Sequence, residues 1–293
     1  MYQAVCFGEI LWDNFKDGKK AGGAPMNVAL HLHKQGIKSY LISSVGTDAN
    51  GDELLLFLED NQLNTHFIQK HATLPTGIVE VELDENLHAS YTIVKPVSWD
   101  EIHFANELID ITENADVLVF GSLACRSEIS RNTLFKLLPL AKLKVFDMNL
   151  RPPHFHEEIL ISLLNACDIL KINEVEIEYL TQLFGLSHLT SNEQLRELSQ
   201  KTNTPIICVT LGGDGSMIFY KDEVIRHKGY KVELADTVGA GDAFLATFIG
   251  GYLKKLPIKQ ILDKASAAGA FVASKHGANP QYNQTDLENI INQ

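Results

Sequence analysis

Short apolar runs alternate with segments of helical length along most of this chain, and that alternation limits the folds it can adopt. The runs are residues 4–7, 40–45, 117–120, 143–147, 169–172 and 206–210. Each is too short and too uniformly apolar for a strand with one face in water. We therefore expect a sheet that is covered by other elements on both faces.

Amphipathic patterns with a helical period separate these runs. They occupy residues 25–35, 52–61, 127–140, 157–166, 174–183 and 192–200. Pro25 near a helix start and Gly36 just past its end follow the usual preference of these residues. Repeated strand–helix alternation implies right-handed crossovers, so the sequence predicts an α/β sandwich of three layers with a mainly parallel central sheet.

One stretch breaks the pattern. Residues 76–83 and 87–94 flank a polar turn at 84–86 and partly alternate between apolar and polar side chains, which predicts an antiparallel hairpin. Residues 10–20 could pair with it and complete a small sheet over the mouth of the α/β body. The pattern leaves open whether this sheet is a lid or only a surface hairpin.

From about residue 216 onward the chain reads as a strand pair at 217–220 and 224–227, followed by helices at 240–254 and 258–275. Since no internal repeat or Pro/Gly/Ser-rich linker divides the sequence, we expect one domain over residues 1–293. The small sheet would then come from about residues 10–20 and 74–96 of that domain.

Composition and charge exclude several classes of function. A hydrophobic content of 45% argues against disorder, and a formal net charge of −12 argues against nucleic acid or an anionic membrane as the main partner. The four cysteines are far apart and form no metal-binding or disulfide pattern. The N-terminus has no signal-peptide pattern and no apolar run reaches the length of a membrane span, so we expect a cytoplasmic protein.

Residues 236–242 read DTVGAGD and lead into an apolar helix. A glycine-rich approach to a helix start leaves several amides pointing one way, which together with the helix dipole favours a bound phosphate. Asp242 falls in the first helical turn. From these residues alone it could equally cap the helix or take a proton from a hydroxyl that attacks a phosphoryl group.

The same heptapeptide resembles the C-terminal signature DTxGAGD of the ribokinase-like carbohydrate kinases, the PfkB family. The N-terminal signature of that family, two glycines followed by an asparagine four residues later, is matched by Gly22, Gly23 and Asn27. The two signatures lie about 210 residues apart in the expected order, and the resemblance spans essentially the whole chain. It implies a ribokinase-like fold with a β lid.

Finer features are similar to the fructokinase branch. Residues 8–13, GEILWD, look like the opening of a bacterial fructokinase, and residues 147–152, DMNLRP, match a segment shared with 2-keto-3-deoxygluconate kinases. The lid of the latter kinases usually carries a Tyr/Arg-rich patch for a carboxylate, whereas residues 90–95 here offer only Tyr91 and Lys95. This difference favours a neutral sugar as the acceptor.

The resemblance assigns roles to individual residues. Asp242 would be the catalytic base and the amides of Gly239, Ala240 and Gly241 would stabilise the phosphoryl group. Asp13, Gly22, Gly23, Asn27 and Arg151 would bind the sugar. Asn173, Thr210, Gly212, Gly215, Gly241 and Asn279 would bind ATP. Glu176 would act on Mg²⁺ through water, and Asp236, Val238, Val272 and Gly277 would be candidate ligands of K⁺.

The expected reaction transfers the γ-phosphoryl group of ATP to a primary hydroxyl of a sugar, foremost the 6-hydroxyl of D-fructose. Ribose, a nucleoside or 2-keto-3-deoxygluconate are alternative acceptors, and a sugar-binding regulator without catalysis is an alternative of another class. A nicotinamide dehydrogenase is disfavoured because no strand–GxGxxG–helix unit is present. His154 and His156 read as residues of a solvated loop. The sequence leaves open whether the lid edge forms a homodimer.

Overall fold

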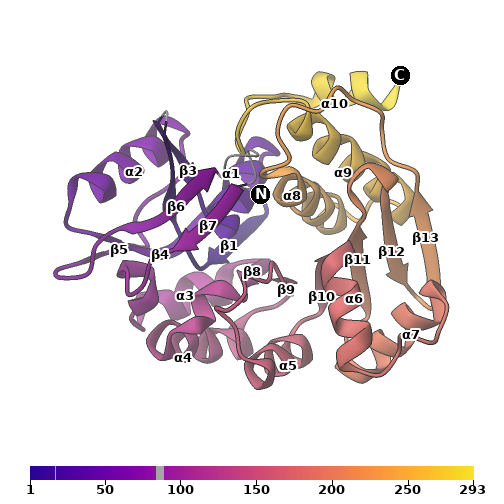
Figure 1. The fold of residues 1–293 in the computed structure, drawn as a ribbon, viewed down its shortest axis with the longest axis horizontal. Coiled ribbons are helices and arrows are strands. Elements are labelled where there is room, and N and C mark those ends of the chain that lie inside the picture. Colours follow the sequence, from indigo (N-terminus) through magenta and orange to yellow (C-terminus); the bar gives the residue numbers. More distant parts are fainter. Residues whose placement is uncertain (17, 84–88) are drawn as a thin grey trace.

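The computed structural model describes residues 1–16, 18–83 and 89–293. A nine-stranded sheet runs through it in the order β13-β12-β11-β10-β9-β8-β1-β4-β5 (Figure 1). From β11 to β5 all neighbouring strands are parallel, whereas β11 and β12, and β12 and β13, pair antiparallel. The strands are β1 (Gln3–Phe7), β4 (Lys38–Gly46), β5 (Ile68–His71), β8 (Val117–Gly121), β9 (Lys144–Asp147), β10 (Ile169–Asn173), β11 (Ile206–Thr210), β12 (Ser216–Tyr220) and β13 (Glu223–His227).

Helices cover both faces of this sheet. They are α1 (Ala24–Lys34), α2 (Ala49–Asp60), α3 (Glu107–Asn114), α4 (Glu128–Leu137), α5 (Glu157–Ala166), α6 (Glu174–Leu183), α7 (Ser191–Thr202), α8 (Ala240–Leu253), α9 (Ile258–Ala273) and α10 (Gln284–Ile291). Side chains of β1 alternate between two cores. Val5 and Phe7 pack with the core that includes α3 to α7, while Ala4 and Cys6 pack with the core of α1, α2, α8 and α9. The predicted three-layer α/β sandwich is confirmed.

The predicted strands and helices are found within a few residues of their expected bounds. The helix predicted at 127–140 is split, because Pro139 has no N–H to continue the ladder and α4 ends at Leu137, followed by a 3₁₀ turn over Leu138–Leu140. Among the α-helices and strands of the described residues, β5, α3 and α10 were not predicted. Each is short, and only four residues of β5 pair with the rest of the sheet.

A second, four-stranded sheet lies against one side of the body (Figure 1). Its strands are β2 (Leu11–Phe15), β3 (Gly18–Gly22), β6 (Gly77–Leu83) and β7 (Ala89–Ile93), in the order β3-β2-β6-β7. The predicted antiparallel pairing of β6 with β7 is confirmed, and residues 10–20 do pair with it, through parallel contacts of β2 with β6. The turn predicted at 84–86 lies outside the described residues.

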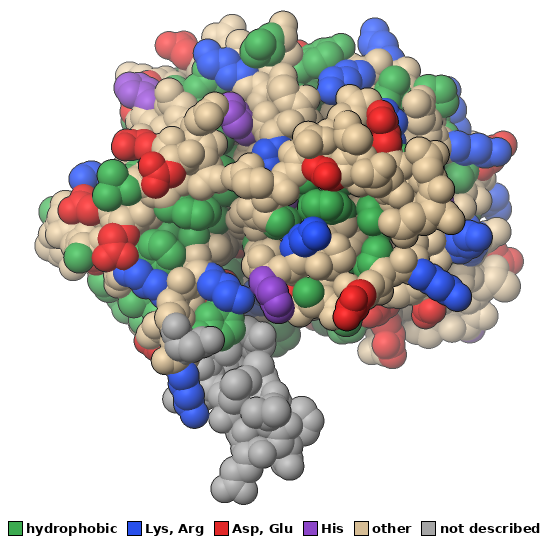
Figure 2. All heavy atoms as spheres, turned by 90° about the horizontal axis from the view of Figure 1, so that it is seen from above, with side chains coloured by type: hydrophobic (Ala, Val, Ile, Leu, Met, Phe, Trp, Pro, Cys, Tyr) green, Lys and Arg blue, Asp and Glu red, His purple; other side chains and the backbone are tan. Residues whose placement is uncertain are grey.

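The surface and the helix lengths bear on possible partners. On the face shown in Figure 2, acidic and basic side chains are interspersed rather than gathered in a block of one sign. Among the residues that the structure describes, no helix combines the length and hydropathy needed to cross a bilayer.

A buried ion pair ties the end of the small sheet to the body. The guanidinium of Arg126 donates to both carboxylate oxygens of Asp100, at 2.7 and 2.8 Å, and to the carbonyl oxygen of Val94 at 2.8 Å. Arg126 also stacks 4.0 Å above the ring of Trp99. Both charged side chains are almost completely buried, so each depends on the other for compensation.

We predict that Arg126→Met lowers the free energy of unfolding by about 3–5 kcal/mol, because the carboxylate of Asp100 is left buried without its partner. Lys70→Met is the matched control, since Lys70 pairs with Asp52 at 3.0 Å with both side chains more than half exposed. That exposed pair should cost less than about 1 kcal/mol. Urea unfolding of both variants checks the difference, and equal losses would contradict the structural role given to Arg126.

Candidate functional site

Functional side chains gather at the carboxyl edge of the parallel strands. Glu9 follows β1, Asp147 ends β9 and Asn173 ends β10. The N-terminus of α8 lies at the same edge, because α8 packs along α1 and its Gly241 meets the side chain of Lys171 from β10. Ligands of open α/β sheets bind at this edge, outside the strand ends.

The glycine-rich segment before α8 has the geometry of an anion-binding turn. Gly239 caps the helix with a φ of 80°, and a Cβ there would overlap the backbone of Ala278, so no other residue fits without strain. Within the described part of the chain, the amides of Gly239 and Gly241 have no backbone acceptor. The amide of Ala240 reaches the carbonyl oxygen of Thr237 at 3.3 Å.

Asp242 sits in the first turn of α8 and faces α1. The side-chain amide of Asn27 donates to Asp242 Oδ2 at 2.8 Å. Burial raises the pKa of Asp242 to about 6, and the neighbouring Asp147 adds to this, while Lys171, Asn27 and Arg151 oppose it. The carboxylate is therefore ionised at neutral pH with a pKa well above that of a solvated aspartate, as a general base requires.

Lys171 places a buried positive charge directly beside this helix start. Its ammonium lies 3.0 Å from Asp147 Oδ1, and both side chains are nearly inaccessible. A Cβ on Gly241 would come within 2.9 Å of Lys171 Nζ, so glycine allows the ammonium to approach the backbone of α8. Burial alone would lower the pKa of Lys171, but the carboxylates of Asp147, Glu176 and Asp242 raise it to about 12.

Glu176 and Asn173 form a reciprocal cap at the start of α6. Asn173 Oδ1 accepts from the amides of Val175 and Glu176, and Glu176 Oε2 accepts from the amide of Asn173 at 2.9 Å. Glu176 Oε1 accepts from the amide of Leu150 at 2.8 Å. Both carboxylate oxygens of Glu176 thus accept a backbone amide, which fixes the side chain beside Asn173.

The residues expected to bind the sugar lie where β2, β3 and α1 meet. A Cβ on Gly22 would come within 2.5 Å of Asp13 Oδ2, and one on Gly23 would overlap the carbonyl of Glu9. Both glycines therefore make room for neighbouring groups. Burial raises the pKa of Asp13 to about 6, against the opposing charges of Arg151 and Lys20.

Arg151 is exposed, and among the residues that the structure describes it donates only to its own neighbour, the carbonyl of Leu150, at 3.4 Å. Its charge nevertheless opposes the rise in the pKa of Glu9, Asp13 and Asp242, so it lies near both the expected sugar site and Asp242. His154, expected in a solvated loop, has a ring Nδ1 that is buried and has no partner among the described residues.

The residues expected on the nucleotide side follow β11. Thr210 ends that strand, and Gly212 and Gly215 have φ values of 53° and 98° in the turn to β12. A Cβ on Gly215 would overlap the carbonyl of His227. This turn runs close to α6, because a Cβ placed on Gly212 would lie 3.8 Å from a carboxylate oxygen of Glu174.

The residues expected to hold a monovalent cation are brought together by Asp236. Its carboxylate accepts from the amide of Val238 at 3.0 Å and from the amide of Gly277 at 3.1 Å. This pairing joins the two loops through hydrogen bonds to one carboxylate. The carbonyl of Val272 already accepts the amide of Lys275 at 2.9 Å, so it is the least free of the candidate ligands.

Three residues of this site were not singled out from the sequence. Lys171 lies inside an apolar strand, and a charged residue in such a run is the signal that could have found it. Asp147 was seen only as part of a motif. Glu9 is buried, one of its oxygens has no partner among the described residues, and burial raises its pKa to about 7.

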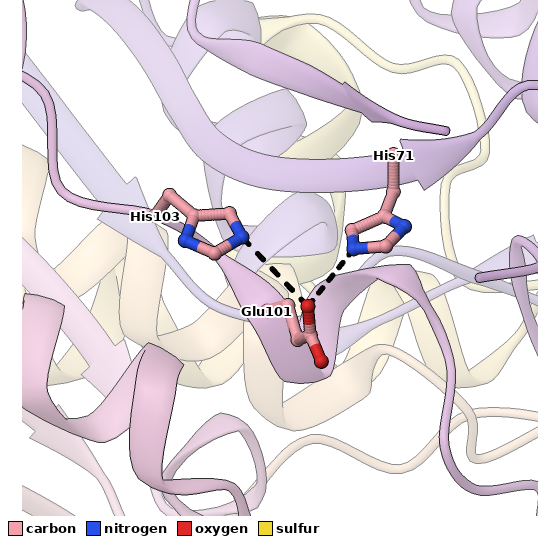
Figure 3. Close-up of side chains that lie close together, drawn as sticks. All are labelled: His71, Glu101 and His103. Atoms are coloured by element: carbon pink, nitrogen blue, oxygen red, sulfur yellow. Dashed lines mark hydrogen bonds and ion pairs between the residues drawn. The ribbon is translucent and has the colours of Figure 1, made fainter. Parts of the chain in front are cut away.

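A separate cluster combines His71, Glu101 and His103 (Figure 3). His71 Nδ1 accepts from the amides of Thr73 and Leu74 at 3.2 and 2.8 Å, so the ring proton is on Nε2, which lies 2.9 Å from Glu101. A nitrogen that ligates a metal must be unprotonated. This cluster therefore joins β5 to the 3₁₀ turn at Ser98–Glu101 and does not have the donor set of a metal centre.

Comparison with known proteins agrees with this arrangement. The family model of the pfkB family carbohydrate kinases matches residues 2–285. A Pyrococcus horikoshii protein named as a sugar kinase is 32% identical over 271 residues, covering 89% of this chain and 83% of its own. Its crystal structure aligns with a TM-score of 0.82 over 99% of both chains at 29% identity, and it has also been solved with ATP.

Two further relatives differ in their acceptor. An Arabidopsis thaliana chloroplast protein named as fructokinase-6 is 31% identical over 306 residues, covering 94% of this chain and 78% of its own. An ATP-dependent 6-phosphofructokinase of Thermoanaerobacterium thermosaccharolyticum is 29% identical over 279 residues, covering 91% and 82%. The chain described here belongs to the pfkB family of carbohydrate kinases and is a sugar kinase with a ribokinase-like fold.

Proposed function

We propose that this sugar kinase transfers the γ-phosphoryl group of ATP to the 6-hydroxyl of D-fructose, with Asp242 as the base. The observation that carries the mechanism is the position of Asp242. It lies in the first turn of α8, in contact with Asn27 from α1 and beside two amides that have no backbone acceptor among the described residues. A proton acceptor and an anion site thus share one helix start.

The chemistry follows from this arrangement. Asp242 takes the proton from the acceptor hydroxyl as that oxygen attacks the γ-phosphorus of ATP, while the bond from the γ-phosphorus to the β–γ bridging oxygen breaks and ADP leaves. The amides of Gly239 and Gly241, with the positive end of the α8 dipole, stabilise the charge on the transferred oxygens. The ammonium of Lys171 lies against Gly241 and adds a fixed positive charge in a water-poor setting. Positioning and electrostatics supply most of the rate enhancement in such transfers.

The donor side is proposed to be the carboxyl edge of β10 and β11. Asn173, Thr210, Gly212 and Gly215 would line the ATP site, and the ATP complex of the Pyrococcus relative supports ATP as the donor. Mg²⁺, held through water near Glu176, would neutralise phosphate charge. K⁺ near Asp236 would strengthen the positive potential at the start of α8.

The acceptor is proposed to be a neutral sugar because its site is rich in carboxylate. Asp13 can accept hydrogen bonds from two neighbouring hydroxyls. Glu9 and Asp236 lie nearby and contribute to the electrostatics of Asp242 and Asp13. The small sheet carrying Asp13 would act as a lid that excludes water, which would otherwise accept the phosphoryl group.

The acceptor is tested directly with a panel of substrates. D-fructose should give the highest sugar-dependent release of ADP, above ribose, a nucleoside, 2-keto-3-deoxygluconate and fructose 6-phosphate. Coupled-enzyme assays of kcat/KM, run with and without K⁺, provide the ranking. A preference of about tenfold or more for a phosphorylated or carboxylated acceptor would overturn the fructose assignment while leaving the sugar kinase intact.

Asp242→Asn should keep the shape of the site and lose the base. We expect turnover to fall by about 10²–10⁴-fold with fructose binding nearly unchanged, as measured by steady-state kinetics and calorimetry. Asp110→Asn, at an exposed position of α3, is the control and should behave as wild type. Near-normal turnover of Asp242→Asn would remove Asp242 from the mechanism.

Asp147→Asn tests the electrostatic setting of the base. Asp147 raises the pKa of Asp242, and its removal leaves Lys171 free to lower that pKa further. Activity requires ionised Asp242 and is lost as the pH falls through its pKa, about 6 in the wild type. The acid limb of kcat should therefore move to lower pH, by about one pH unit. Asp168→Asn removes a carboxylate paired with Lys144 at the opposite edge of the sheet and should leave the limb in place. An acid limb of kcat that stays in place or moves to higher pH in Asp147→Asn would contradict the influence of Asp147 on the pKa of Asp242.

A further inference from the structure

Asn279 belongs to the loop after α9 and was expected to contact the nucleotide, but its side chain is engaged elsewhere. Asn279 Nδ2 donates to Asn27 Oδ1 at 2.6 Å, and Asn27 Nδ2 in turn donates to Asp242 Oδ2 at 2.8 Å. Three residues from the start of α1, the start of α8 and the post-α9 loop are thus joined in one directed chain of hydrogen bonds.

The direction of these hydrogen bonds is set by the negative charge of Asp242. An ionised carboxylate can only accept, so Asn27 must present its NH₂ group to Asp242 and its carbonyl oxygen to Asn279. Asn279 must then present its NH₂ group to Asn27. A donor at position 279 therefore favours the same orientation of the Asn27 amide that Asp242 requires, whereas an acceptor at this position would oppose it.

The loop is held rigidly enough for this role. Lys34 Nζ donates to the carbonyl oxygens of Asn279 and Pro280, at 3.1 and 2.9 Å. Burial lowers the pKa of His31 to about 3, so its ring is neutral, with Nε2 2.9 Å from the carbonyl of Ala278 and Nδ1 2.9 Å from the Tyr282 hydroxyl. Asn27, His31 and Lys34 lie on one face of α1 and fix the loop at successive points.

We propose that Asn279 is a positioning residue for phosphoryl transfer, which orients the amide of Asn27 so that Asn27 holds Asp242 in place as the base. This inference rests on the proposed function of Asp242. It assigns the Asn279 side chain to the base rather than to the nucleotide. The charged groups that also act on Asp242 are Asp147 and Lys171 from the sheet, Arg151 from the loop after β9, and Glu9 after β1.

Two variants at this position separate orientation from shape. Asn279→Leu keeps the volume but donates nothing, so the Asn27 amide loses its fixed orientation. We expect kcat to fall about tenfold, with KM for ATP within about twofold of wild type. The acid limb of kcat should shift to higher pH, because the bond from Asn27 that favours ionised Asp242 is weakened.

Asn279→Asp keeps the shape but reverses the bond. Its carboxylate accepts from Asn27, which turns the carbonyl oxygen of Asn27 toward Asp242, so kcat should fall further and the acid limb should move further up in pH. A residue that serves only to fill space would tolerate Asp better than Leu. If Asn279→Leu does not fold, Asn279→Ala removes the same donor with less volume change.

Control variants come from the same loop and its contacts. Gln281→Leu removes an exposed side chain that donates to Asn61 at 3.2 Å, away from Asn27. Lys34→Met releases the loop backbone without touching the Asn279 side chain. Gln281→Leu should match wild type. Lys34→Met should lower the stability of the protein but move the acid limb of kcat little.

The pKa of Asp242, followed by carboxyl ¹³C NMR with Asp242→Asn to assign the signal, is a readout that needs no turnover. Wild-type enzyme inactive on every sugar would end the proposed function yet still allow this measurement. A rise of the pKa in Asn279→Leu but not in Gln281→Leu supports the role of Asn279. An Asp242 titration unchanged in all Asn279 variants overturns it, as does a raised KM for ATP with an unchanged kcat.

Discussion

The rest of the site depends on the electrostatic interactions of the buried ammonium of Lys171. It is enclosed at the carboxyl edge of the sheet with three carboxylates, those of Asp147, Glu176 and Asp242. One positive charge cannot compensate three negative charges in a medium of low dielectric constant, so neighbouring groups must supply the remaining stabilisation of the carboxylates. Glu176 obtains it from two backbone amides, and Asp242 from Asn27 and the start of α8. The excess negative charge that persists would suit a site that recruits a divalent cation with its nucleotide.

The fold sustains this concentration of charge by bringing distant segments into close backbone contact. Glycine is required at two of these contacts, where Gly239 meets Ala278 and where Gly23 meets Glu9, because a Cβ at either position would overlap the neighbouring main chain. The first contact joins the start of α8 to the loop after α9, and the second joins the start of α1 to the end of β1. Both helix starts are therefore held at the same edge of the sheet, where Asn27 and Asp242, 215 positions apart in the chain, share a hydrogen bond.

The sequence predicted the parts of this protein that depend on local patterns. The buried strands, most helices and the pairing of β6 with β7 follow from periodicity and turn residues. Short elements such as β5 and α3 escaped because tertiary packing, rather than a strong local pattern, stabilises them. The family signatures located Asp242, Asn27 and Asp13, but the roles given to them remain predictions.

What sequence patterns could not provide is the direction of side chains. Asn279 was identified as part of a loop near the nucleotide, yet its amide turns toward Asn27, a partner 252 positions away. Lys171 is visible in the sequence as a charge inside an apolar run, but its counterion and its contact with Gly241 arise only when β9, β10 and α8 are assembled. Such pairings depend on the register of neighbouring strands and on helix packing, which short motifs do not encode.

A crystal structure of the enzyme with D-fructose and a non-hydrolysable ATP analogue tests the role of Asp242 most directly. We predict one sugar hydroxyl within about 2.6–3.2 Å of an Asp242 carboxylate oxygen. The γ-phosphate should lie against the amides of Gly239 and Gly241, in line with that hydroxyl. A ternary complex with the sugar bound at Asp13 but every hydroxyl out of reach of Asp242, or with the γ-phosphate away from the start of α8, would contradict it.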